Sequence, residues 1–429
     1  MNRIRSTWRP VILCLASLAP VALAQAPAKT YAQELIEETL ARHPEVATLA
    51  MHVTPPNSPD NIIIASNFGR IGKKGDEDDL KVIQTGKPTV ELNQSGDRFS
   101  VELPLRDVGG NTIGALAVAF SYQAGDDKTK LQKQAEKVRD ELSKRITYLA
   151  NLFEPAQFDP SIPSNTYAQQ LVDQTLERHP EIIILAMHVR PPNAKDNVII
   201  ASNIGRIGKK ADEDDMKVVN TGVPNLEVNK NGDRFEAEIA LHNVSGERIG
   251  ALSVVFPYKS SEDKAKFQEQ AEKISDELGR RITYVANLLE PADWNPQVPK
   301  HIYAQQLVDE TLAKHREVLI LAIHAAPPNM KDTVIVASNI GRIGKKADDD
   351  DMKVVETGTP NLEVNKNGDR FEAEIVLEDA SGKPVGALSV VFPYKSGDDK
   401  ARFQQMAEQV RDEMKGKILT LGRLFEPAR

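Results

Sequence analysis

The chain contains the same pattern three times. The first copy reads ASNFGRIGKKGDEDD over residues 65–79, and the pattern returns over residues 201–215 and 337–351. Tyr31, Tyr167 and Tyr303 are landmarks of the three copies and lie 136 residues apart, with no insertion or deletion between them. A repeat of this length is larger than a solenoid unit and can bury a core of its own. We therefore predict three complete domains in tandem, over residues 30–156, 166–292 and 302–428.

Proline-rich segments join the copies. Glu154 to Pro163 and Glu290 to Pro299 each hold three prolines in ten residues. Such segments are extended and fairly stiff. Phe158 and Trp294 lie in the middle of these connectors, and we expect them to hold each connector against a neighbouring domain.

Residues 1–24 have the pattern of a secretory signal peptide. Three arginines precede the short apolar run from Val11 to Leu18, and Ala22-Leu23-Ala24 fits a small-residue cleavage site. The apolar run is too short for the roughly 20 residues that a membrane span requires. Cys14, the only cysteine, lies inside this segment. We therefore expect a periplasmic or secreted protein without disulfides.

The charge of the chain excludes some partners. The net charge is −8, and loss of Arg3, Arg5 and Arg9 with the signal peptide would bring it near −11. An acidic surface argues against nucleic acid and against adhesion to anionic lipid. No apolar stretch after the signal peptide reaches the length of a membrane span, so we expect a soluble chain.

Hydrophobic periodicity indicates an α+β domain. Apolar residues at helical spacing, strict alternation and turn residues define the elements of each copy. In the second copy we expect helices over residues 167–178, 212–219 and 262–289, and strands over residues 181–189, 197–202, 226–228, 235–241 and 249–258. The last helix is expected to be long and unbroken.

This order of elements carries a resemblance. With ASNIGRIGKKADEDD, GDRFEAEIAL and SGERIGALSVVFPY, the second copy resembles the extracellular PAS-like sensor domains of the Cache group, such as the periplasmic domains of citrate and fumarate sensor kinases. The resemblance implies a five-stranded antiparallel sheet with helices on one face and a small ligand on the other. The family's hairpin pattern D-x-x-G-x-x-I-G is complete in the first copy, whereas Asn243 and Val385 interrupt it in the others. The family's membrane helices and output module are not found, so we expect the protein to act through a partner.

The resemblance also implies where a ligand would bind. The pocket would lie between the end of the second strand, the GRIGKK loop and the last strand. Arginine beside glycine N–H groups suits a carboxylate, which an arginine fork binds at two points. The alternative is that the lysines pair with the neighbouring acidic run on a solvated loop. The candidate ligand-binding residues of this loop are Ser66, Asn67, Arg70 and Lys73, then Ser202, Asn203, Arg206 and Lys209, then Ser338, Asn339, Arg342 and Lys345.

A histidine near the end of the first strand is a further candidate. His52, His188 and His324 share a strand face with alanine, by the period of two. Such a histidine either reaches into the pocket or is hydrogen-bonded locally at the strand end. We therefore include all three among the candidate ligand-binding residues.

Catalytic and metal-binding motifs are not found. The acidic run lacks the glycine and glutamate of a calcium-binding EF-hand loop. The sequence holds no HExxH motif, no phosphate-binding loop and no nucleophile elbow. We expect no enzyme, no metal and no cofactor. Two hypotheses stay open: an exported sensor-like protein with up to three ligand pockets, and an array of PAS-like modules that bind protein partners without a ligand.

Overall fold

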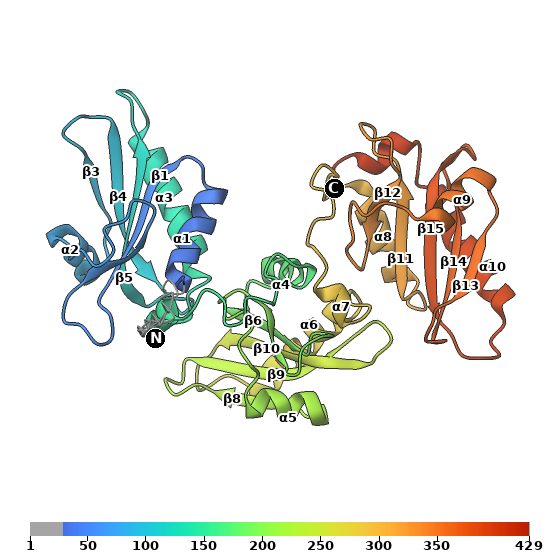
Figure 1. The fold of residues 1–429 in the computed structure, drawn as a ribbon, viewed down its shortest axis with the longest axis horizontal. Coiled ribbons are helices and arrows are strands. Elements are labelled where there is room, and N and C mark those ends of the chain that lie inside the picture. Colours follow the sequence, from blue (N-terminus) through green and yellow to red (C-terminus); the bar gives the residue numbers. More distant parts are fainter. Residues whose placement is uncertain (1–28, 429) are drawn as a thin grey trace, which may run out of the picture.

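The structure is a computed structural model that describes residues 29–428. The predicted signal peptide, residues 1–24, lies outside the described residues. Figure 1 shows the chain as three separate domains, the first in blue, the second in green and yellow, and the third in orange and red. The second domain lies between the other two.

Each domain is built on one antiparallel sheet of five strands. In chain order, the strands of each sheet lie side by side as second, first, fifth, fourth and third. With its flanking helices this sheet gives an α+β, PAS-like domain, which confirms the predicted fold class. The first domain comprises α1 (Tyr31–Arg42), β1 (Val46–Val53), β2 (Ile62–Ser66), α2 (Glu77–Thr85), β3 (Thr89–Leu92), β4 (Arg98–Arg106), β5 (Thr112–Ser121), α3 (Lys128–Ser143) and η1 (Leu149–Phe153).

The other two domains repeat this order. The second comprises α4 (Tyr167–Arg178), β6 (Ile184–Val189), β7 (Val198–Ser202), α5 (Glu213–Thr221), β8 (Asn225–Val228), β9 (Arg234–His242), β10 (Arg248–Pro257), α6 (Lys264–Gly279) and α7 (Val285–Leu288). The third comprises α8 (Tyr303–Lys314), β11 (Ile320–Ala325), β12 (Val334–Ser338), α9 (Asp349–Thr357), β13 (Asn361–Val364), β14 (Arg370–Glu378), β15 (Pro384–Pro393), α10 (Lys400–Lys415) and η2 (Leu421–Phe425).

The short helix of each domain is fixed at both ends by local chemistry. The Asp212 side chain accepts hydrogen bonds from the N–H groups of Asp214 and Asp215, and the Asp215 side chain accepts one from the Asp212 N–H, which forms a capping box. Gly222 ends the helix with a φ of 75°, a left-handed conformation that favours glycine. Helix α5 therefore begins where the acidic run places it.

The core of each domain lies on one face of its sheet. In the second domain Leu252, Val254 and Phe256 of β10 pack with Leu171 of α4 and Ile274 of α6. Because side chains alternate along a strand, Ala251, Ser253 and Val255 point to the opposite face. The two long helices cover the core face, which leaves the opposite face to α5 and to the GRIGKK loop.

The last helix is shorter than we predicted. The sequence indicated one helix over residues 262–289, but α6 ends at Gly279 and a single further turn, α7, follows. The chain leaves the helix because the Ile282 carbonyl accepts a hydrogen bond from the Val244 N–H, at 2.8 Å, in the hairpin before β10. Tyr284, with a φ of −165°, is extended and lies at the end of the domain.

Among residues 29–428, no helix is both long enough and apolar enough to cross a lipid bilayer.

Candidate functional site

A cavity of about 540 Å³ lies against the sheet of the third domain, on the face opposite the core. It is bordered by strands β11, β14 and β15, by the GRIGKK loop and by the start of α9. Asn243, Thr283 and Tyr284 of the second domain also line it. The cavity therefore lies where the resemblance placed a ligand, and the preceding domain contributes to its wall.

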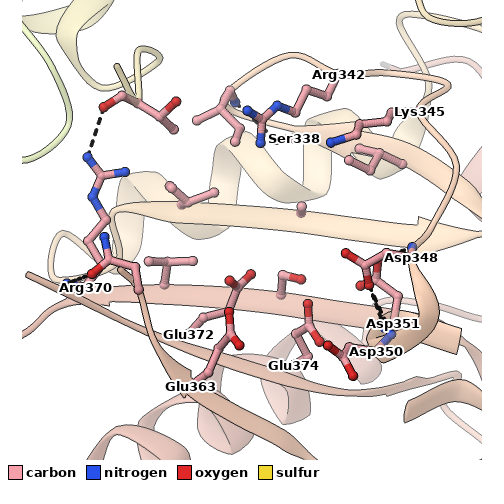
Figure 2. A pocket seen from close by; sticks show the side chains of 18 of the residues that line it. Ser338, Arg342, Lys345, Asp348, Asp350, Asp351, Glu363, Arg370, Glu372 and Glu374 are labelled. Atoms are coloured by element: carbon pink, nitrogen blue, oxygen red, sulfur yellow. Dashed lines mark hydrogen bonds between the residues drawn. The ribbon is translucent and has the colours of Figure 1, made fainter. Parts of the chain in front are cut away.

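Carboxylates form one side of this cavity. Figure 2 shows Glu372 and Glu374 of β14 with Asp351 of α9, across the cavity from Arg342 and Lys345. The two glutamates share a face because they are two positions apart on a strand. We call Asp351, Glu372 and Glu374 the carboxylate cluster. The second domain has Asp215, Glu236 and Glu238 in the same places, and the first has Asp79, Ser100 and Glu102.

A buried histidine contacts the cluster in each domain. The Nδ1 atom lies 2.7 Å from Asp351 in His324, 3.1 Å from Asp215 in His188 and 2.8 Å from Asp79 in His52. His188 Nε2 is also 3.3 Å from the Ser253 hydroxyl. The histidine therefore lies at the pocket side of the sheet and is also paired locally with an aspartate. The two alternatives offered by the sequence, a histidine in the pocket and a locally bonded one, are both met by this arrangement.

The acids of the cluster differ in pKa. Burial, together with the nearby Asp215 carboxylate, raises the pKa of Glu238 to about 8. Burial and the Asp351 charge likewise raise the pKa of Glu374 to about 8, although a hydrogen bond from Asn361 opposes the shift. Burial also acts to raise the pKa of Asp215, but the hydrogen bond and charge of His188 hold that pKa below its usual value. At neutral pH the aspartate is ionised and the glutamate holds a proton.

Several polar atoms at these clusters have no hydrogen-bond partner within the described chain. They include Asp215 Oδ1, Glu102 Oε2 and both amide atoms of Asn61. Asn61 and Asp215 are more than nine-tenths buried. In the second domain, oxygens of Asp212, Asp215 and Glu238 all lie within 4.8 Å of one another. Buried polar groups ordinarily have a partner, so this arrangement suits a cationic group.

The arginine of the GRIGKK loop has a different partner from the one we expected. Arg206 Nε donates to Glu154 Oε2 at 2.9 Å, and its Nη2 donates to Oε1 at 3.1 Å. Its guanidinium also lies over the Tyr148 ring. Both partners belong to the preceding domain. Arg342 makes the same fork with Glu290, at 2.8 Å on both bonds. These guanidinium charges are thus neutralised between domains, although Arg342 also borders the cavity.

The asparagine after the second strand also holds the loop to the preceding domain. Asn203 Nδ2 donates to the carbonyls of Ile183 and Lys144, at 2.9 and 2.8 Å. Asn339 Nδ2 donates in the same way to the Arg280 carbonyl of the second domain. In the first domain Asn67 bonds only within its own domain, to Ala47 and Leu49. The structure therefore gives the asparagine a role in joining domains.

The remaining candidates divide between cavity and loop. Ser338 and Lys345 line the cavity, and Lys345 Nζ lies 5.5 Å from the centre of the Trp294 ring of the connector. The Ser202 hydroxyl accepts from the Ile204 N–H at 3.0 Å and supports the turn. The three candidates of the first domain contact no other domain in the described chain: buried Ser66 bonds to the Gly69 carbonyl of its own turn, while Arg70 and Lys73 are exposed.

Both connectors contact the next domain at the predicted positions, through the backbone of Phe158 and through the ring of Trp294. The Phe158 N–H donates to the Ile207 carbonyl at 2.8 Å, and Trp294 lies beneath Lys345. The carboxylate cluster, in contrast, was not identified from the sequence. Glu236 and Glu238 alternate with the apolar residues of the strand predicted over residues 235–241, a pattern typical of a half-buried strand. Because the two long helices of such a domain cover the other face, this polar side of β9 could have been assigned to the pocket.

Comparisons with known proteins give distant structural matches only. No family model matches the chain, and no curated protein matches it in sequence. The GAF domain of nlh2 from A. aeolicus is 16% identical, with 27% of this chain and 83% of that chain covered and a TM-score of 0.23. The chromophore-binding domain of Stigmatella aurantiaca bacteriophytochrome is 12% identical, with 61% and 97% covered and a TM-score of 0.19. With TM-scores this low, neither match supports a statement about the ligand or the output of this chain.

Proposed function

We propose that the protein is an exported, sensor-like binding protein whose PAS-like domains take a small organic cation, and that it passes on the signal through a partner. It binds its ligand and does not transform it. The Cache group is the class of sensor domain that its motifs fit best. The observation that carries the proposal is the buried carboxylate cluster on the pocket side of each sheet.

The charges of the cavity favour a cation over the carboxylate that the sequence led us to expect. Arg342 is paired with Glu290 and so offers little free positive charge to an anion. The loop brings two lysines to the cavity, and one of them, Lys346, is paired with Asp332. Even with Glu374 protonated, the lining carboxylates outnumber these lysines: Asp348, Asp350, Asp351, Glu363 and Glu372. An ammonium group can pair with a buried carboxylate at short range, where the low dielectric strengthens the attraction.

The apolar wall of the cavity suggests the rest of the ligand. Ile320, Ile340 and Val391 line the cavity beside the carboxylate cluster. A short alkyl or ring body would remove this surface from water, at about 25 cal/mol per Å² of apolar area buried. The ligand class that fits is therefore a protonated amine with a small apolar body.

The three pockets are not equivalent. The first domain has Ala117 where the second has Ser253, and Thr89 where the second has Asn225. It also lacks the glutamate that corresponds to Glu236. The second and third domains keep all of these groups, so we expect them to bind the same amine, and the first domain to bind it more weakly.

A thermal-shift screen of the mature chain tests the proposal. Short alkylamines and cyclic amines are compared with carboxylates of the same size. A ligand at 100 times its dissociation constant stabilises the native state by about 2.7 kcal/mol. We expect stabilisation by amines only, and its loss in the Glu238→Gln/Glu374→Gln variant. Glu272→Gln, an exposed change on α6, serves as the matched control.

Other outcomes would redirect the proposal. Stabilisation by Ca²⁺ or Mn²⁺ alone, lost in the same variant, would make the cluster a metal site. Stabilisation by carboxylates would restore the ligand class expected from the sequence. If no compound stabilises the chain, the array that binds protein partners without a ligand is the better description.

A further inference from the structure

Two joints connect the three domains, and both are built in the same way. In each joint the GRIGKK loop of the following domain is covered by the end of the preceding one. Ile204 packs against Val108 of the first domain, and Ile340 against Val244 of the second. A methyl group on Gly205 would lie 2.5 Å from the Tyr31 ring, which shows how closely the loop is covered.

Polar contacts complete each joint. The fork from Arg206 to Glu154 is accompanied by Arg234, whose Nη2 donates to the Thr147 carbonyl at 3.0 Å. Arg370 donates in the same way to the Thr283 carbonyl, at 2.9 Å. The preceding domain thus presents a carboxylate, a tyrosine ring and open carbonyls, and the following domain presents two arginines and apolar loop residues.

The first domain keeps the same loop, but no part of the described chain covers it. Phe68 is 41% exposed and Ile71 is 58% exposed, whereas Ile204 and Ile207 are 5% and 6% exposed. Arg98, which corresponds to Arg234, is also exposed. We call Asn67, Phe68, Arg70, Ile71 and Arg98 the open joint face.

The loop of the open joint face already has the docked conformation. Arg70 has a φ of 63°, and Arg206 in the joint has a φ of 67°. Positive φ is uncommon for a residue other than glycine and costs free energy. The backbone of Arg70 therefore has the same left-handed conformation as the arginines of the two joints, although no other domain contacts it in the described chain.

The opposite end of the chain does not match this face. Arg423 stands where the joints have Asn151 and Asn287, and it pairs with Glu426 of its own domain. Its guanidinium lies 4.3 Å from the centre of the Tyr303 ring. If a second copy of the chain docked on the open joint face, it would have to offer Glu426, which is already paired with Arg423 of its own domain.

We propose that the open joint face is a docking surface for a partner protein that presents a carboxylate beside a tyrosine ring and exposed carbonyls, as the ends of the first two domains do. The apolar part of this face is smaller than in the joints, with Ala47, Thr48 and Ala119 in place of isoleucine, leucine or valine. A smaller apolar contact fits a partner that binds reversibly. In the third domain the corresponding Ile340, Arg342 and Arg370 also line the ligand cavity, so the open joint face borders the pocket side of its domain. Docking at this face does not depend on the proposed ligand.

The experiment uses the full mature chain as its own probe. The Thr420→Tyr/Arg423→Asn variant restores at its last domain the tyrosine and asparagine that the joints use. We expect its weight-average mass, measured by sedimentation over a range of concentrations, to rise to at least twice that of the unchanged chain. Adding Arg70→Glu to this variant should return it to a single copy, whereas adding Lys133→Glu, an exposed change on α3, should not.

Two results would overturn the proposal. A Thr420→Tyr/Arg423→Asn variant that stays folded by circular dichroism but remains a single copy at all concentrations would show that the open joint face does not dock such an end. Association of the unchanged chain that is lost in Arg70→Glu would show that the occupant is a second copy and not a different protein.

Discussion

At the scale of single residues, the carboxylate cluster makes stability depend on pH. Burial raises the pKa of Glu238 in the folded chain to about 8, from an ordinary value of 4.5. The stabilising contribution of such a group is complete below pH 4.5 and is lost as pH rises through 8. Glu238→Gln keeps the shape of the protonated acid, but the glutamine side chain cannot ionise as the pH rises. We expect denaturation midpoints of variant and parent to agree near pH 5, and the variant to be more stable by about 1–3 kcal/mol near pH 8.5. A constant difference at both pH values would contradict this.

The same titration sets how a cation binds. An amine that pairs with Glu374 must displace its proton, because the pKa of that carboxyl is raised to about 8 by burial. Affinity should therefore rise with pH, by up to tenfold for each unit below 8, and level off above it. Isothermal titration of the strongest amine from the screen, at pH 6, 7 and 8, measures this. If amine binding releases a proton in the parent but not in Glu374→Gln, the Glu374 carboxyl is the group that loses it. If the affinity for the amine does not change with pH, Glu374 does not pair with the amine.

At the scale of elements, the GRIGKK loop joins domains in two of its three copies. Arg206→Ala removes the fork to Glu154 and leaves that carboxylate without its strongest partner. Because both side chains are largely buried, we expect a loss of about 1–3 kcal/mol in the free energy of unfolding. Arg70→Ala is the matched control: it removes the corresponding exposed arginine and should change stability by less than about 0.5 kcal/mol. Urea denaturation of the two variants provides the comparison, and equal losses would show that the joint adds nothing.

Elements also show how far sequence can predict this molecule. Helix α4 has the bounds that periodicity indicated, and α5, capped by Asp212, begins within one residue of the helix predicted over residues 212–219. Both depend on local patterns. The partner of Arg206 could not be predicted in this way, because Glu154 is 52 residues away and in another domain. The role of Glu238 was missed for a related reason: alternation separates the two faces of a strand but does not say whether the polar face meets water or a pocket.

At the scale of the whole molecule, the joints fix how the domains lie relative to one another. Each combines an arginine fork, an apolar cluster and a proline-rich connector. The Arg206→Ala/Arg342→Ala variant keeps the connectors and all three cores but loses both forks. Its domains should therefore sample more orientations, since domains of one chain move relative to one another unless a large and hydrophobic interface holds them.

Small-angle scattering of the chain from residue 25 onward measures this loosening. We expect a larger radius of gyration in the double variant, with faster proteolysis in residues 155–163 and 291–299, and no change in Arg70→Ala. Circular dichroism should match the parent, because no core residue is altered. Scattering identical to that of the parent would mean that the clusters around Ile204 and Ile340 hold the joints without the arginines. The next variant would then be Val108→Ser/Val244→Ser, which removes the apolar contact of the preceding domain in both joints.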